Sequence, residues 1–229
     1  MPNPFTRRMI APLLFGLGGA GILIGLGLWQ LQRLDWKTAK LAEIAARITA
    51  APVALPTLPD PVAALYLPVT LSGSLTGREL DVLTSIKDAG PGYRVIAGFL
   101  TADGRQVMVD LGFLPEAARN APRPTGMFRV TGNLVWPNET DSFTPVPDRN
   151  ANIWFARDVA LMSQALQTEP LLVAARTVDP AIAEITPLPV DTAGIANDHF
   201  QYAMTWFSLT VGWLGMTGLL LWRIRQRSV

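Results

Sequence analysis

Two long uncharged stretches lie near the ends of the chain. They cover residues 9–28 and 202–222, and neither contains Asp, Glu, Lys or Arg. A helix of about 20 residues is about 30 Å long, which is the thickness of the hydrocarbon core of a bilayer. The core of a signal peptide is shorter and ends in small residues, whereas the first stretch ends in Leu28, Trp29 and Gln30. We therefore predict two retained transmembrane helices, over residues 9–29 and 202–222.

The charges that flank these stretches predict their orientation. Three arginines follow the second stretch, at positions 223, 225 and 227, and cationic residues accumulate on the cytoplasmic side of membrane helices. The first stretch has cationic residues on both sides, so its flanking charges do not indicate an orientation. The charges after the second stretch therefore set the orientation of both spans. Both termini, residues 1–8 and 223–229, are then cytoplasmic, and the body, residues 30–201, lies outside. A span that starts at residue 9 leaves no room for a mitochondrial transit peptide, so we expect a bacterial inner membrane and a periplasmic body.

Small residues at helix-packing spacing occur in both stretches. Gly21 with Gly25 form a GxxxG pair, and Ser208 with Gly212 form a looser equivalent. Such pairs let two membrane helices approach closely, although glycine is also simply frequent in such helices. They are candidate contacts between the two spans.

The body between the spans has the pattern of a β domain. Residues 34–48 contain good helix formers without Gly or Pro, so the first span is expected to continue as a helix until the prolines between residues 52 and 61. Asp158 is a candidate N-cap of a helix to about residue 167, and residues 180–197 lead back to the membrane. Runs rich in Val, Leu, Ile and aromatic residues predict strands over residues 65–73, 80–86, 93–100, 106–113, 128–135 and 171–178.

The expected fold class is thus a membrane α+β protein. Two transmembrane helices, one N-terminal and one C-terminal, flank a periplasmic, mainly antiparallel β domain with one or two helices.

The composition removes several classes of function. The 229 residues include no Cys and one His, which excludes disulfides, thiolate metal sites and multi-histidine zinc sites. The chain has 19 Lys and Arg and 18 Asp and Glu, and a net charge of +1 does not indicate a nucleic-acid partner. Phosphate-loop, dinucleotide, metalloprotease and hydrolase motifs are absent, and the carboxylates are scattered, so we expect the protein not to be an enzyme.

The one histidine lies at the outer end of the second predicted span. Residues three, four and seven positions apart share one face of a helix, so His199 shares a face with Tyr202, Ala203 and Trp206. At the outer end of the first span, the same spacing gives a face lined by Trp29, Arg33, Trp36 and Lys40, with Gln30 and Lys37 alongside. If the two helices are adjacent, an imidazole, several aromatic rings and cations meet at one membrane depth.

This cluster has two interpretations. Imidazole is a common axial ligand of haem iron, Arg and Lys suit the haem propionates, and aromatic rings would flank the macrocycle. A histidine at a membrane interface is also commonly an anchor or a polar helix end, here with Asp198 as the N-cap, while Arg33 and Lys37 suit lipid headgroups. Spacing alone leaves both interpretations open.

Two blocks at the outer ends of the spans resemble a known family. The first, GLWQLQRLDWK at residues 27–37, is similar to G-x-W-Q-x-x-R-x-x-W-K, and the second, NDHFQYAMTWF at residues 197–207, to N-x-H-x-x-Y-A-x-x-W-F. The sequence resembles the surfeit locus protein 1 family, the membrane assembly factors of cytochrome c oxidase. Further landmarks of that family fall on residues 92–95, 103–104, 112–115 and 152–154. The chain departs from the family at Asp110-Leu111, where Asn-Arg is typical, and at Phe113, where Trp is typical.

The resemblance implies a protein that binds haem a as a transient cargo and assists its insertion into the large catalytic subunit of the oxidase. It implies His199 as an axial ligand of the haem iron, with Met204 or water as options for the second ligand. The residues implied around the haem are Trp29, Arg33, Trp36, Tyr202 and Trp206, and Lys37 completes the candidate cofactor-binding set. Haem A synthase and membrane lipid are further expected partners.

Two other functions are compatible with the residues. A periplasmic scaffold would bind oxidase subunits or haem A synthase without itself carrying haem. A two-span sensor or transporter accessory protein is disfavoured, because residues 1–8 and 223–229 are too short for a cytoplasmic output domain.

Overall fold

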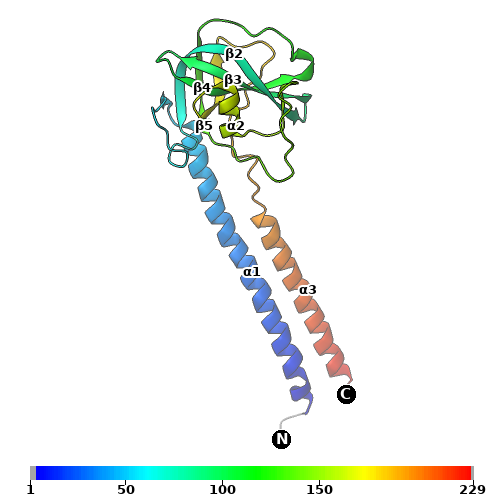
Figure 1. Cartoon of the computed structure of the whole chain (residues 1–229). Helices are drawn as coiled ribbons and strands as arrows, with labels where there is room; N and C mark the ends of the chain where they lie inside the picture. Colours follow the sequence, from blue (N-terminus) through cyan, green and yellow to red (C-terminus); the bar gives the residue numbers. More distant parts are fainter. Residues whose placement is uncertain (1–3, 228–229) are drawn as a thin grey trace. The chain divides into compact units, whose positions relative to one another are not determined.

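The computed structural model describes residues 4–227, with side chains from residue 7 onward. The chain divides into two units, which Figure 1 shows in the colours of the sequence. The helical unit consists of Met1–Glu43 together with Ala193–Val229, and the barrel unit consists of Ile44–Thr192. The ends expected in the cytoplasm, residues 1–8 and 223–229, lie partly outside the described residues.

Two long apolar helices make up the helical unit. Helix α1 (Pro4–Thr49) contains the first predicted span and its predicted continuation in one helix of 46 residues, whose last turns belong to the barrel unit. Helix α3 (His199–Gln226) contains the second predicted span. Both helices are long and apolar enough to cross a bilayer, and most of the residues in their apolar stretches are exposed. Such exposure of apolar side chains is what a lipid environment requires.

Three glycines of α1 make the contact between the helices, which lie side by side in Figure 1. A Cβ atom on Gly16, Gly19 or Gly27 would approach within 2.2–2.5 Å of side chains of α3, namely those of Thr217, Trp213 and Phe207 respectively. The indole Nε1 of Trp213 donates a hydrogen bond to the carbonyl of Gly16 at 2.9 Å. Residue numbers rise along α1 as they fall along α3, so the two helices are antiparallel.

The predicted contact through Gly21, Gly25 and Gly212 is wrong. A Cβ atom at any of these positions would have no neighbour within 4 Å, and Ser208 is exposed. Every face of these helices is apolar, so the sequence pattern does not distinguish the face that meets the partner helix from the faces that lipid would cover.

Five strands of the barrel unit form a barrel-like sheet that closes on itself. Their order is β2 (Pro68–Ile86), β3 (Gly90–Thr101), β4 (Gln106–Pro115), β7 (Leu172–Asp179) and β5 (Phe128–Val135), and β5 pairs with β2 again. All these pairings are antiparallel except β4 with β7. Two short strands, β1 (Val53–Ala54) and β6 (Ile153–Trp154), pair in parallel with β2, and Glu116–Ala118 form a 3-10 turn. The predicted mainly antiparallel β domain is confirmed.

Strand β2 joins two predicted strands into one. Residues 65–73 and 80–86 were expected to be separate, but a single strand runs over Pro68–Ile86. Its pairing with β3 shifts between Leu75 and Glu79, and Gly77 has φ +77° there. Glycine adopts this conformation without strain, so the apparent turn signal is a β-bulge. The strand can therefore bend and pair with β5 through its first part and with β3 through the rest.

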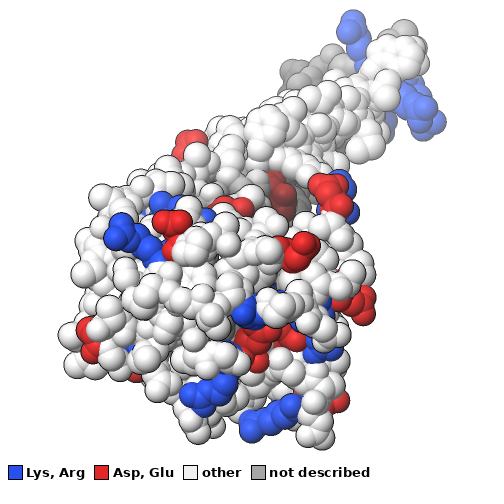
Figure 2. Space-filling view, turned by 90° about the horizontal axis from the view of Figure 1, so that it is seen from above, with Lys and Arg blue, Asp and Glu red and all other residues white. Residues whose placement is uncertain are grey.

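Apolar residues cover both faces of the sheet. Side chains such as those of Val95, Phe99 and Val173 form one buried cluster. The neighbouring positions form a second cluster beneath helix α2 (Val159–Leu166), in which Met162 packs with Ile96. The predicted N-cap of this helix is confirmed, because the Asp158 side chain accepts a hydrogen bond from Leu161 N at 2.9 Å. The face of the barrel unit in Figure 2 carries acidic and basic side chains interspersed, with no large area of one sign.

The last turn of α1 is held by polar groups of the barrel. The buried Asn133 donates from Nδ2 to the carbonyls of Ile48 and Tyr66, both at 2.9 Å. Arg176 Nη2 also donates to the Ile48 carbonyl at 2.9 Å. Carbonyls at a helix C-terminus have no partner within the helix, and a cation there also complements the helix dipole. These bonds join the end of α1 to β5 and β7.

We expect Gly19→Leu to destabilise the helix pair, because its side chain would overlap the ring of Trp213. Overpacking of this kind costs about 1–3 kcal/mol. Gly21→Leu is the matched control, since a Cβ atom at Gly21 has no neighbour within 4 Å. Thermal unfolding of the full chain in mild detergent should show a lower midpoint for Gly19→Leu only. Equal midpoints for the two variants would contradict the packing described.

Candidate functional site

The structure brings the one histidine of the chain against the other helix. His199 is the first residue of α3 and is half-buried, and its Nδ1 lies 2.8 Å from Oε1 of Gln30 on α1. An amide oxygen accepts a hydrogen bond, so in the neutral imidazole this contact favours the tautomer with the proton on Nδ1 and the lone pair on Nε2. Ala203, one turn further along α3, is fully buried, so α3 is closely packed at this position. Asp198 stands at the N-cap position, but its side chain makes no capping hydrogen bond.

The other predicted site residues remain more open. The Arg33 guanidinium lies over the ring of Trp36, 4.8 Å from its centroid, in a cation–π contact within α1. Three aromatic residues expose about half of their surface: Trp29 50%, Trp36 54% and Tyr202 57%. Lys37 and Trp206 are half-buried, whereas Met204 is 50% exposed. The structure therefore joins His199 to Gln30 and Arg33 to Trp36, and it leaves broad aromatic surface free at this end of the helices.

This arrangement offers one metal-binding nitrogen rather than a metal cage. Among residues 4–227, no group of three or more His, Cys, Asp or Glu side chains could hold a metal ion. The Nε2 atom of His199 can contribute one ligand to a metal whose other ligands come with it. The exposed rings of Trp29, Trp36 and Tyr202 can cover flat apolar surface, and Arg33 and Lys37 can pair with carboxylates.

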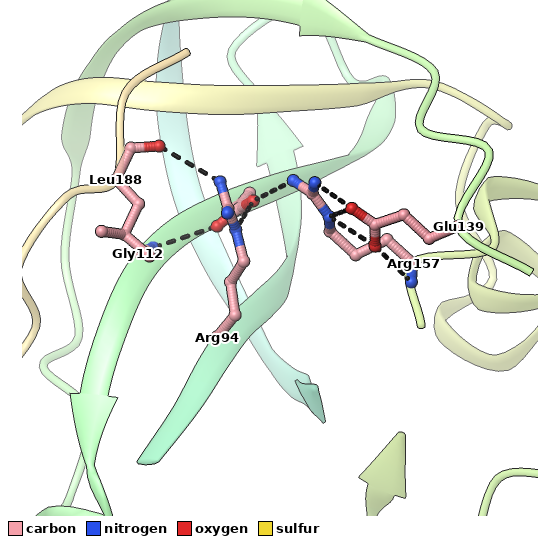
Figure 3. A network of polar contacts seen from close by, with 6 residues as sticks. Arg94, Gly112, Glu139, Arg157 and Leu188 are labelled. Atoms are coloured by element: carbon pink, nitrogen blue, oxygen red, sulfur yellow. Dashed lines mark hydrogen bonds and ion pairs between the residues drawn. The ribbon is translucent and has the colours of Figure 1, made fainter. Parts of the chain in front are cut away.

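A second polar cluster lies inside the barrel unit, around Asp110 on β4 (Figure 3). Asp110 is 1% exposed and accepts hydrogen bonds from Arg94 Nε and, at 3.3 Å, from Arg157 Nη1. Arg157 also forms an ion pair with Glu139, and Oε2 of Glu139 accepts a hydrogen bond from the Arg157 backbone N–H at 3.0 Å. Arg94 Nη2 donates to the carbonyl of Leu188 at 3.1 Å. The cluster thus ties two strands, the loop after β5 and the segment that leads to α3.

Charge and burial oppose each other in this cluster. Burial raises the pKa of the Asp110 carboxyl, and the charges of Arg94 and Arg157 counteract the rise. Burial also disfavours the charged form of Glu139, but the hydrogen bonds and charge of Arg157 outweigh it, so the pKa of Glu139 is lowered. The ion pairs therefore depend on one another, and none of their members is a free acid or base.

The divergent segment at Asp110-Leu111 has a structural role. The resemblance leads one to expect an arginine at position 111, where this chain has Leu111; Arg94 and Arg157 supply cations to Asp110 from β3 and from the loop before α2. Gly112 has φ +116°, and a Cβ atom there would lie 2.1 Å from the carbonyl oxygen of Thr186. The linker can approach so closely because this position has no side chain. Sequence reasoning missed this cluster, since its members lie far apart in the chain.

A groove of about 540 Å³ is also present on the barrel unit. It is lined by residues 57–61, Trp136 and residues 169–171. Arg105 organises one wall, because it donates to the carbonyl of Pro56 at 2.8 Å and to Glu169 at 2.7 Å. No motif in the sequence pointed to this groove.

Comparison with known proteins places both terminal blocks within one family match. The sequence matches the SURF1 family over residues 18–211. It is 31% identical over 210 residues to surfeit locus protein 1 of Xenopus tropicalis, covering 80% of this chain and 67% of the relative. It is 30% identical over 236 residues to a SURF1-like protein of Drosophila melanogaster, covering 92% and 78%. It is 28% identical over 200 residues to a SURF1-like protein of Rickettsia felis, covering 83% and 88%.

We expect Asp110→Asn to destabilise the protein strongly, because two part-buried guanidiniums would lose their shared counter-charge. Breaking a buried ion pair in this way costs about 3–5 kcal/mol. Lys40→Gln, which removes the exposed Lys40–Glu43 pair, should cost less than about 1 kcal/mol. The midpoint of thermal unfolding measures both changes. Similar midpoints for Asp110→Asn and Lys40→Gln would refute the role given to the cluster.

The pairing of Glu139 with Arg157 should make stability depend on acidity. Because the pKa of Glu139 is lower in the folded state, the pair stabilises above the unfolded value of about 4.3 and is lost as the pH falls through the lower folded value. Glu139→Gln should therefore lower the unfolding midpoint at pH 6, and the difference from wild type should shrink below about pH 4. Glu184→Gln is the matched control at an exposed carboxylate. A difference for Glu139→Gln that is independent of pH would argue against this pairing.

Proposed function

The chain belongs to the SURF1 family, and from that premise we propose that it is a membrane-bound assembly factor for cytochrome c oxidase. In this proposal it binds haem a as a transient cargo and assists its insertion into the large catalytic subunit, and it catalyses no reaction of its own. The observation that carries the proposal is the 2.8 Å contact between Nδ1 of His199 and Oε1 of Gln30, which occupies one ring nitrogen and assigns the role of iron ligand to the other, Nε2.

The proposed location is the inner membrane of a bacterium. Residues 9–29 and 202–222, within α1 and α3, would span the bilayer, with residues 1–8 and 223–229 in the cytoplasm and residues 30–201 in the periplasm. The length and apolar surface of both helices support the two spans. Basic residues in the last turn of α3 support a cytoplasmic C-terminus. Membrane lipid is then a permanent partner of this chain.

A haem is a suitable cargo for a site with one histidine. The macrocycle already supplies four nitrogen ligands to the iron, so the protein needs to add only one or two. Gln30 holds Nδ1–H of His199, which is the kind of outer contact that orients a metal-binding imidazole and makes it a better ligand. His199 would supply one iron ligand through Nε2, with Met204 or water as the options for a second ligand.

The surroundings of His199 suit the rest of the haem. Trp29, Trp36 and Tyr202 are each about half exposed and would lie against the macrocycle, with Trp206 beside them. Arg33 and Lys37 would pair with the propionates. Such a half-open site also suits a protein that must release its cargo to the catalytic subunit or receive it from haem A synthase.

A scaffold that carries no haem is the second candidate function. It is favoured by the groove of about 540 Å³ on the barrel unit, which could receive part of an oxidase subunit or of haem A synthase. In that case His199 would serve only as a contact between α1 and α3.

We expect the full chain, purified in mild detergent from a host that makes haem A, to carry haem a at close to one equivalent. His199→Ala should lose the pigment or change its visible spectrum, because an axial ligand is removed. Gln30→Ala should retain the ligand but bind haem about 10–100-fold more weakly, as is typical when an outer contact of a metal ligand is lost. Gln201→Ala, an exposed position on α3, is the matched control and should behave as wild type.

Visible spectroscopy and extraction of the pigment measure these outcomes. Colourless wild-type protein from a host shown to contain haem A would overturn the haem role and favour the scaffold. Equal haem content in wild type and His199→Ala, with unchanged spectra, would overturn the assignment of His199 as the ligand.

A further inference from the structure

The loop between β5 and β6 presents two apolar side chains almost entirely to solvent. Phe143 is 89% exposed and Val146 is 86% exposed. Among the large apolar side chains that the structure describes in the barrel unit, only Leu58 and Val62 have comparable exposure. Burying side chains of this size is favourable, so two neighbouring ones in solvent indicate a surface that another molecule covers.

Two aspartate-centred turns fix the ends of this apolar loop, defined here as residues 141–148. Oδ1 of Asp141 accepts hydrogen bonds from Phe143 N at 2.8 Å and from the Thr144 hydroxyl at 3.0 Å. Oδ1 of Asp148 accepts from Asn150 N and Ala151 N, both at 3.0 Å. Prolines at positions 145 and 147 fix their own φ angles between the two turns. The loop is therefore held in one shape, although its apolar side chains contact little of the barrel.

The base of the loop is also anchored to the barrel. Glu139 is bound by Arg157, which reaches the buried Asp110 (Figure 3). Asn138 forms a β-bridge with Asp158, and Asp148 exchanges two backbone hydrogen bonds of 2.9 Å with Ile153. A loop that is already ordered loses little conformational entropy when it binds, which increases affinity.

The shape and charge of the loop favour a protein as its partner. A fixed shape is an advantage against a surface that is itself fixed, whereas a fluid lipid surface adapts to any apolar group. Asp141 and Asp148 bracket the two apolar side chains with carboxylates. The hydrogen bonds from Phe143 N and the Thr144 hydroxyl lower the pKa of Asp141, so it is ionised at neutral pH. Carboxylates are repelled by anionic headgroups and attracted by Lys or Arg.

We propose that the apolar loop is a docking element for a partner protein that offers an apolar pocket rimmed by basic side chains. Phe143 and Val146 enter the pocket, and Asp141 and Asp148 face its rim. The inference rests on the proposed function, which makes the large catalytic subunit of the oxidase the partner to test. It adds to that function the surface of this chain that the subunit contacts.

The test measures how much catalytic subunit co-purifies with the tagged full chain from a host that assembles the oxidase. Phe143→Ser with Val146→Ser should reduce the recovered subunit at least tenfold. The unfolding midpoint should not fall, because both side chains are exposed. The matched control is Met127→Ser with Val62→Ser, which removes two side chains that are 63% and 84% exposed in other loops and do not line the groove. The control should recover as much subunit as the wild type.

Unchanged recovery with the Phe143 and Val146 variant, or an equal loss with the control, would overturn the docking assignment alone. Absence of the subunit from the wild-type preparation would overturn the proposed partner itself and the assignment with it. A photo-crosslinking phenylalanine analogue at position 143 gives a second readout on the intact chain. An adduct with the catalytic subunit supports the proposal, whereas adducts only with lipid or with a second copy of this chain overturn it.

Discussion

The contact between α1 and α3 is the constraint on which the candidate haem site depends. Helices in lipid gain no hydrophobic stabilisation by associating, so they rely on close packing and hydrogen bonds. The glycines of α1 allow the two helices to approach closely, and the indole N–H of Trp213 donates a hydrogen bond to the Gly16 carbonyl at 2.9 Å. Gln30 follows Gly27 by three residues along α1, and the same packing of the two helices places it against His199. The packing that places the ring of Phe207 on Gly27 therefore also brings Nδ1 of His199 to the Gln30 side chain.

Buried polar groups hold the barrel unit where the chain enters it and where it leaves it. At the entrance, Asn133 and Arg176 bind the last turn of α1 through the Ile48 carbonyl. At the exit, Arg94 links Asp110 to the Leu188 carbonyl within the segment that leads to α3. Buried charges of this kind are costly unless each is paired, so a substitution in either group should loosen the barrel unit at that end. Between these two ends, two apolar clusters pack against the two faces of the sheet.

Local signals predicted local structure well and long-range contacts poorly. Strand β5 has the predicted bounds, and Asp158 caps α2 as expected. Both features depend on residues that are adjacent in the sequence, namely a run of strand-forming residues and a capping side chain. The bulge at Gly77 was misjudged, since a glycine beside a strand also predicts a turn. The partners of Asp110 lie 16 and 47 residues away, where no spacing rule applies. Within the candidate site, the spacing placed Gln30 only alongside the predicted face of the first span, and the structure shows that Gln30 is the residue that contacts His199.

The position of the proton on His199 is the sharpest test of the proposed haem site. The chain contains one histidine, so labelling of histidine with nitrogen-15 in the full chain, purified without a histidine tag, gives the signals of a single ring. In the neutral imidazole we expect the proton on Nδ1 before haem is added, and loss or a large shift of the Nε2 signal when haem a binds. A proton on Nε2 in the free protein, or an Nε2 signal unchanged by haem a, would contradict the account.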